Sequence, residues 1–157
     1  MRVGILTASD TRTAAGDESG RAIAELVATL DGAQIVASEI VADDAAALSA
    51  ALVRLADEVR CDVVLTTGGT GVAPRDVTPE ATVAVCDRLV PGLAEAMRAA
   101  SLAKTPMAML SRATAGLRGR TLIINLPGSP KAVRECLAVV LPVLPHAVDL
   151  AGGGKPH

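Results

Sequence analysis

Apolar residues along the chain form short continuous runs that alternate with stripes at helical spacing. The run at residues 3–8 predicts a strand covered on both faces, as in parallel sheets. Residues 34–41 and 62–66 predict two further strands. Between them, apolar side chains three and four positions apart predict helices over residues 17–31 and 43–59. This alternation implies right-handed crossovers and a parallel sheet.

Prolines mark the next helices. Thr78 as N-cap, with Pro79 in the first helical position, predicts a helix to about residue 87. Pro91 can open another helix, which Pro106 ends. The residues suited to cap the two earlier helices are Asp17 or Ser19, and Asp43 or Asp44.

The remaining elements follow an irregular segment. A turn at residues 117–120 separates a short strand from the apolar run 121–126, which predicts an antiparallel pair. Ser129 can cap a last helix, and Pro142 and Pro145 interrupt it. The pattern predicts one α/β domain.

Length and composition limit the possible functions. The 157 residues fit one domain, expected over residues 1–150 with a flexible tail at 151–157. Half of the residues are hydrophobic but none is aromatic, so a planar ligand must lie against aliphatic groups. Stacking of bases on aromatic side chains is excluded, and a net charge of −2 without a basic block argues against a nucleic-acid partner.

The chain carries no pattern of a secreted or membrane protein. A strand-like run follows Met1 at once, so no signal peptide is expected, and no apolar run approaches the ~20 residues that span a bilayer. The three cysteines show no C-x-x-C spacing and are interpreted as small buried residues. We expect a cytoplasmic protein with no membrane partner.

Residues 65–81 are the first candidate site. The third predicted strand leads into the turn Gly68-Gly69-Thr70-Gly71, and the pair Arg75-Asp76 follows. A glycine turn between a strand and a helix lets backbone N–H groups approach phosphate closely. The run lacks the lysine of a Walker A loop, and it lacks the third glycine of the dinucleotide fingerprint. A tight turn without a ligand remains the alternative.

Other polar loops follow the predicted strands. The carboxyl ends of parallel strands share one edge, which brings together residues 9–16, 42–44, 67–76 and 125–129. Asp10, Asp43 and Asp76 can each serve as turn or cap residues, but three loops bring them to one edge. Mg²⁺ is held by one or two carboxylates plus substrate phosphates, which suits this set. Cations that could offset phosphate charge are Arg12, Arg75, Arg112 and Lys131.

The histidines lie far from these loops. They are His146, in the last predicted helix, and His157, in the tail, so a nucleophile activated by histidine is a poor interpretation. A reaction that joins two phosphates needs no general base, because its nucleophile is already an anion. Positioning and charge neutralisation would then carry catalysis.

Four motifs together resemble the molybdopterin adenylyltransferases, which include the bacterial Mog and MoaB proteins and the G domain of gephyrin. The resemblance covers roughly residues 3–150. The motifs are SDTRT at residues 9–13, TTGGTG with PRDVTPEAT at 66–82, MLSR at 109–112 and NLPGSP at 125–130.

The resemblance implies a three-layer α/β/α fold with a mostly parallel sheet, usually in a homotrimer, although a hexamer stays open. The implied reaction joins Mg²⁺-ATP and molybdopterin into adenylyl-molybdopterin and pyrophosphate, within molybdenum cofactor biosynthesis. The terminal phosphate of the pterin attacks the α-phosphorus of ATP. The chain lacks the fused second domain of the eukaryotic members, so we expect that another protein inserts the molybdenum. The resemblance therefore also implies a contact with that molybdenum-insertion protein.

Site residues are carried over from the matching motifs. Asp43 and Asp76 match the aspartates linked to catalysis and to the metal. The binding positions, toward nucleotide or pterin, are Ser9, Asp10, Gly68, Gly69, Thr70, Gly71, Ser111, Asn125, Pro127, Gly128 and Ser129.

One departure from the family pattern is visible. The family often has Val-Pro-Asp where this chain has Val41-Ala42-Asp43, so Asp44 is an alternative to Asp43 as the working residue. Two functional alternatives also stay open. One is a catalytically weak molybdopterin carrier or scaffold of the same fold, and the other is hydrolysis of a different nucleotide.

Overall fold

A mixed sheet is the centre of the computed structural model, which describes residues 1–154. Its six strands lie in the order β2-β1-β3-β6-β5-β4. They are β1 (Arg2–Ala8), β2 (Gln34–Val41), β3 (Val63–Thr67), β4 (Arg88–Leu89), β5 (Ala115–Arg118) and β6 (Thr121–Leu126). The first four strands of this order pair in parallel, and β5 pairs antiparallel with β6 and β4. The predicted parallel sheet and antiparallel pair are confirmed.

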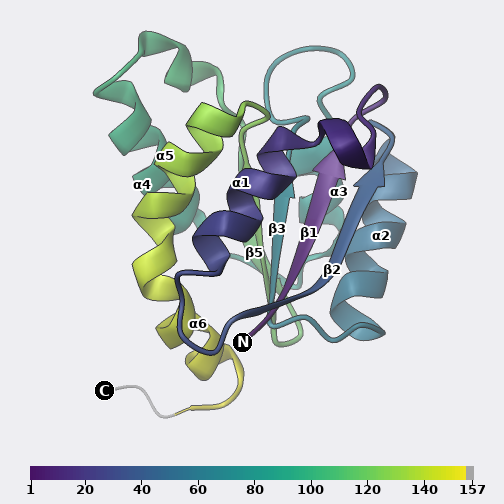
Figure 1. The fold of residues 1–157 in the computed structure, drawn as a ribbon, viewed down its shortest axis with the longest axis vertical. Coiled ribbons are helices and arrows are strands. Elements are labelled where there is room, and N and C mark those ends of the chain that lie inside the picture. Colours follow the sequence, from purple (N-terminus) through teal and green to yellow (C-terminus); the bar gives the residue numbers. More distant parts are fainter. Residues whose placement is uncertain (155–157) are drawn as a thin grey trace.

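Helices cover both faces of this sheet (Figure 1). The α-helices are α1 (Glu18–Val27), α2 (Ala45–Asp57), α3 (Thr78–Val85), α4 (Pro91–Leu102), α5 (Pro130–Val140) and α6 (Leu144–Ala151). Short 3-10 turns are η1 (Ala14–Gly16), η2 (Pro106–Leu110) and η3 (Leu141–Val143). This arrangement confirms the predicted α/β/α class.

The core has two parts, one on each side of the sheet. Helices α1, α4, α5 and α6 pack on one face, where β1 contributes Val3 and Ile5. Helices α2 and α3 pack on the other face, where β1 contributes Leu6 and Ala8. Successive strand residues point to opposite faces, so a strand covered on both sides is apolar at nearly every position. Leu, Ile, Val and Ala fill both parts, and the buried Met97 belongs to the first, so the core is aliphatic as the composition predicts.

Two local predictions are corrected. Thr78 is not the N-cap of α3: Val77 holds that position, and the buried Thr78 hydroxyl donates instead to the Gly68 carbonyl at 3.0 Å. The helix also ends at Val85 rather than near residue 87, because the chain turns extended at Cys86 to enter β4. Strand β4 itself has only two residues, too few for a periodic pattern.

Proline breaks the last helix as predicted, giving α5, η3 and α6. Helix α6 includes Ala151, the first residue of the predicted tail, and residues 155–157, with His157, lie outside the described part. No helix in residues 1–154 is long and apolar enough to cross a membrane. The three cysteines are free thiols whose pKa values burial raises, to about 11 for Cys86, which keeps them protonated.

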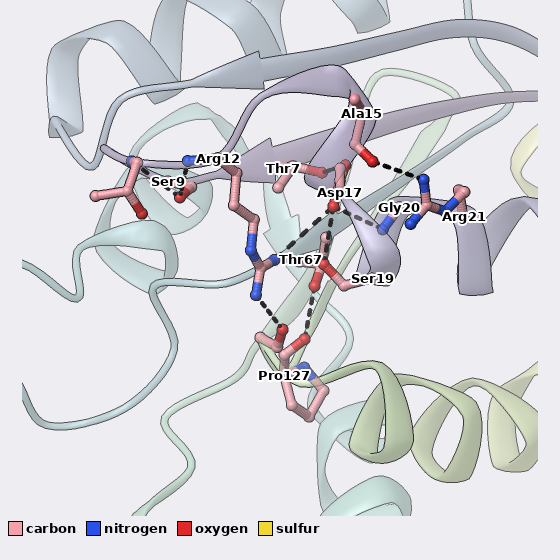
Figure 2. Close-up of polar contacts among 12 residues, drawn as sticks. Thr7, Ser9, Arg12, Ala15, Asp17, Ser19, Gly20, Arg21, Thr67 and Pro127 are labelled. Atoms are coloured by element: carbon pink, nitrogen blue, oxygen red, sulfur yellow. Dashed lines mark hydrogen bonds and ion pairs between the residues drawn. The ribbon is translucent and has the colours of Figure 1, made fainter.

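A buried carboxylate joins α1 to the sheet. Asp17 caps α1 by accepting from the Gly20 N–H at 2.9 Å, and it accepts from the hydroxyls of Thr7 at 2.6 Å and Ser19 at 3.0 Å (Figure 2). Burial alone raises the pKa of Asp17, but these hydrogen bonds and the charge of Arg12 outweigh it and lower the pKa. The charged form of Asp17 is therefore the one that stabilises the fold.

Replacing this carboxylate tests its contribution. Asp17→Asn should lower the free energy of unfolding at pH 7 by about 2 kcal/mol, because a charged acceptor of three hydrogen bonds is lost. A lowered pKa stabilises the fold above the unfolded value of about 3.9, and the contribution disappears as pH falls through the folded pKa. The deficit should thus shrink between pH 5 and pH 3 in urea titrations. The exposed Asp31→Asn is the control, and an equal effect of both variants would refute the assignment.

Candidate active site

The turn after β3 has no room for side chains at its first two residues. Gly68 and Gly69 have φ angles of +92° and +63°, in the left-handed region that glycine favours. A Cβ on Gly68 would lie 2.4 Å from the carbonyl oxygen of Ala8. A Cβ on Gly69 would lie 2.4 Å from the hydroxyl oxygen of Thr78. The glycines let the chain reverse directly against the end of β1.

The four predicted loops meet at this turn. The Thr67 hydroxyl donates to the Pro127 carbonyl at 2.7 Å, which joins the loop after β3 to the loop after β6 (Figure 2). A Cβ on Gly128 would lie 3.5 Å from the Gly68 Cα. The Asp43 N–H donates to the Asp10 carboxylate at 3.1 Å, joining the loops after β2 and β1. The prediction of a shared edge is confirmed.

Two carboxylates flank the glycine turn. An Asp43 oxygen lies 3.3 Å from the Cβ position of Gly69, and an Asp76 oxygen lies 2.8 Å from that of Gly71. Asp76 also accepts from the Ala73 N–H at 2.8 Å. Partial burial, followed by the negative charge of Asp10 and to a smaller extent that of Asp76, raises the pKa of Asp43.

The structure distinguishes Asp43 from Asp44. Asp44 is the N-cap of α2, where its carboxylate accepts from the Ala47 N–H at 2.8 Å. Asp43 is half-buried and faces the turn, while Asp44 is exposed. The helix start therefore uses Asp44, and Asp43 is the residue placed beside Asp76.

The donor chemistry of this pair fits a hard divalent cation. Carboxylate oxygens are the ligands that Mg²⁺ prefers, and one or two of them suffice when phosphate oxygens and water complete the shell. Within residues 1–154, no group of three or more His, Cys, Asp or Glu side chains is arranged to hold a metal. Besides burial, repulsion by Asp10 and Asp76 raises the pKa of Asp43, and a bound cation would relieve that repulsion. Asp43 and Asp76 can thus hold Mg²⁺ together with a substrate.

Three of the four cations expected to meet phosphate bind protein groups instead. Arg75 forms a two-point ion pair with Asp10 at 2.6 and 2.9 Å, and this hydrogen bonding lowers the pKa of Asp10. Arg12 contacts Ser19 and donates to the Gly128 carbonyl at 2.8 Å (Figure 2). Arg12 therefore links the loop after β1 to the loop after β6.

Arg112 holds both ends of the loop after β3. Its backbone N–H donates to the Thr70 carbonyl at 2.8 Å, and its side-chain Nε donates to the Gly71 carbonyl at 2.6 Å. The guanidinium also contacts the Asp76 carbonyl and the Glu80 carboxylate. The backbone and the side chain of one residue thereby hold the loop that presents Asp76. From the sequence we predicted that this arginine contacts phosphate. Its carbonyl partners lie about 40 residues earlier in the chain, and no local pattern reveals them.

The other predicted site residues differ in placement. Asn125 is fully buried, and its amide donates to Thr66 and Thr82 at 3.0 and 2.8 Å, so it supports the site from the interior. The Ser9 hydroxyl accepts from the N–H of Arg12 at 3.1 Å within its own loop. The Ser129 hydroxyl caps α5. These side chains are engaged in holding the loops.

A pocket of about 290 Å³ lies beside the turn. Of the predicted residues, Thr70, Gly71, Ser111 and Pro127 line it. Most of the rest of its wall comes from α4, η2 and α5, and much of that wall is Ala, Met and Leu. The sequence did not reveal this contribution, because apolar residues on a helix face indicate an ordinary core unless the neighbouring elements are known.

Comparison with known proteins gives consistent matches. A family model described as "Probable molybdopterin binding domain" matches residues 4–146. A Helicobacter pylori protein named molybdopterin adenylyltransferase is 48% identical over 98% of this chain and 89% of its own length. An Escherichia coli protein of the same name is 43% identical over 87% of the chain and 72% of its length. The crystal structure of the molybdopterin biosynthesis enzyme MoaB from Thermus thermophilus is 54% identical, with a TM-score of 0.89 over 99% of this chain and 98% of that one.

The hydrogen bonds of Arg112 predict a measurable loss of loop order. In Arg112→Met, amide hydrogen exchange over residues 70–77 should rise about tenfold or more, because charged hydrogen bonds to the loop carbonyls are lost. Arg112→Lys should fall between wild type and Met, since lysine cannot donate to several carbonyls at once. Arg134→Met, which removes a surface ion pair on α5, is the control. Unchanged exchange in Arg112→Met would show that the loop holds its own shape.

Proposed function

The chain belongs to the molybdopterin-binding domain family, and from this membership we propose that it is a molybdopterin adenylyltransferase of molybdenum cofactor biosynthesis. Relatives 43–48% identical carry that enzyme name. The observation that carries the proposal for this chain is the pair Asp43 and Asp76, placed on either side of the glycine turn.

The proposed reaction transfers the adenylyl group of ATP to the terminal phosphate of molybdopterin and releases pyrophosphate. An oxygen of that phosphate forms a bond to the α-phosphorus of ATP, and the bond from the α-phosphorus to the pyrophosphate oxygen breaks. The attacking oxygen is already anionic, so no side chain has to remove a proton. His146 lies in α6, away from the loops at the other end of the sheet (Figure 1).

The loops supply position and charge. Backbone groups of Gly69, Thr70 and Gly71 would receive phosphate oxygens at the reversal of the chain. Asp43 and Asp76 would hold Mg²⁺, which when bound neutralises charge on the phosphates. Because Arg12, Arg75 and Arg112 bind protein groups, the described loops hold little uncommitted positive charge, which supports the need for a cation.

The pterin would occupy the pocket beside the turn. Ser111 and Pro127 line that pocket, which supports the role toward the pterin that we propose for Ser111. Its aliphatic wall suits a flat ring in a protein without aromatic residues. Gly71 lines the same pocket, so a ring bound there can extend its phosphate-bearing chain to the turn.

We also propose a cytoplasmic homotrimer that passes its product to a molybdenum-insertion protein. The exposed apolar side chains of Met107, Met109 and Leu110 in η2 support an interface between copies or with that partner. The free cysteines suit a reducing compartment.

Adenylyl transfer can be measured directly with ATP, Mg²⁺ and molybdopterin. Wild type should release pyrophosphate and form adenylyl-molybdopterin, and Asp43→Asn and Asp76→Asn should each lower kcat by about 100-fold or more, since each removes charge aligned with the reacting phosphates. Asp44→Asn, its neighbour in sequence, should keep nearly full activity and lose only part of a helix cap.

Two outcomes would count against the enzyme. Tight molybdopterin binding by wild type without ATP consumption would identify a carrier. Full wild-type activity in both Asp43→Asn and Asp76→Asn would remove the basis of the assignment.

A further inference from the structure

An ion pair borders the pocket beside the glycine turn. Glu135 of α5 lines the pocket, and its carboxylate lies 3.2 Å from the ammonium nitrogen of Lys104, just after α4. The pair thus places one anionic acceptor and one cationic donor where an otherwise largely aliphatic wall begins.

Three other polar side chains that line the pocket, two on α4 and one just before η2, already have protein partners. Arg98 donates to the Ala113 carbonyl at 2.7 Å. The Ser101 hydroxyl lies 3.5 Å from the Cys136 sulfur, and the Thr105 hydroxyl accepts from the Met107 N–H at 3.3 Å. Glu135 has spare capacity, because a carboxylate can accept about four hydrogen bonds and its partner within residues 1–154 is the single ammonium of Lys104.

We propose that Glu135 and Lys104 select the pterin ring by its 2-amino-4-oxo edge. That edge carries two adjacent donors, the ring N3–H and the 2-amino group, which match the two oxygens of one carboxylate. The neighbouring 4-oxo group is an acceptor for the Lys104 ammonium. Adenine lacks this order of groups, so the pair also keeps the base of ATP out of the pterin pocket. The inference rests on the proposed function and adds the residues that determine ring specificity.

The position of Glu135 on α5 suits a ligand whose ring edge and phosphate end bind at different parts of the pocket. Helix α5 begins at Pro130, next to the loop of Pro127 and Gly128, and Glu135 lies about 8 Å further along the axis at 1.5 Å per residue. Thr70 and Gly71 line another part of the same pocket. A ring edge held at Glu135 therefore leaves the phosphate end free to reach the turn.

A neighbouring ion pair shows the contrast with an ordinary surface contact. Arg134 and Glu25 lie 2.7 Å apart between α5 and α1, and neither lines the pocket. The Glu25 side chain is 61% exposed, whereas that of Glu135 is 26% exposed. The Arg134–Glu25 pair provides a matched control, because it shares the helix and the charge type with Lys104–Glu135.

Two small ligands distinguish recognition of the 2-amino-4-oxo edge from general binding of a flat ring. The probes are 6-hydroxymethylpterin and 6-hydroxymethyllumazine, which carries an oxo group in place of the 2-amino group. Fluorescence titration should show that wild type binds the pterin about tenfold or more tightly, since a carboxylate facing an oxo group loses a charged hydrogen bond. Glu135→Gln should lose or reverse this preference, because its amide can donate to the oxo group. Lys104→Met should weaken both rings to the same extent, because both keep the 4-oxo group.

Glu25→Gln should leave both affinities unchanged, and thermal melting of each variant checks that it folds. An unchanged pterin preference in Glu135→Gln, or no preference in wild type, would overturn the inference. Should Glu135→Gln fail to fold, unchanged affinities in Lys104→Met would overturn it as well. Formation of adenylyl-molybdopterin by wild type, measured in parallel, separates a failure here from a failure of the proposed function.

Discussion

The contact between Gly68 and the end of β1 fixes the geometry of the whole edge. Thr7 and Thr67 are in register in adjacent parallel strands, so Gly68 comes to lie beside Ala8, and a Cβ there would meet the Ala8 carbonyl oxygen at 2.4 Å. The chain can reverse at this point only with glycine. The reversal keeps the turn close to the loops after β1, β2 and β6, and the Thr78 hydroxyl holds it from the side of α3. Asp43 and Asp76 owe their shared position to this approach.

The elements with repeated patterns were predictable from the sequence. Strand β2 was predicted with its observed bounds, and the caps Asp17 and Ser129 lie where their residue types indicate. Predictions from residue type alone were wrong where a side chain binds a partner that is distant in the sequence. Thr78 has the residue type of an N-cap, but its hydroxyl binds the Gly68 carbonyl, ten residues earlier. Strand β4 forms only because Arg88 and Leu89 pair with β5, and no pattern within two residues announces that pairing.

In the site too, some features were predictable from the sequence and others depend on distant partners. Because strand ends meet at one edge, the sequence could bring Asp10, Asp43 and Asp76 together, but it could not assign their partners. Asp10 pairs with Arg75 and Asp44 caps α2, whereas partial burial and the charges of Asp10 and Asp76 raise the pKa of Asp43. The pocket wall was unpredictable for a related reason, since α4 and α5 expose apolar side chains whose neighbours depend on the packing of two distant segments.

These features describe a site that places anionic groups near a turn suited to phosphate and leaves charge balance to a bound cation. The central claim is that the α-phosphate of ATP is held at this turn between Asp43 and Asp76. A crystal structure with Mg²⁺ and α,β-methylene-ATP tests it most directly. The account predicts the α-phosphate against the backbone of residues 69–71, with the cation bound by Asp43 and Asp76. Nucleotide phosphates bound away from the turn, with both aspartates free of metal, would contradict it.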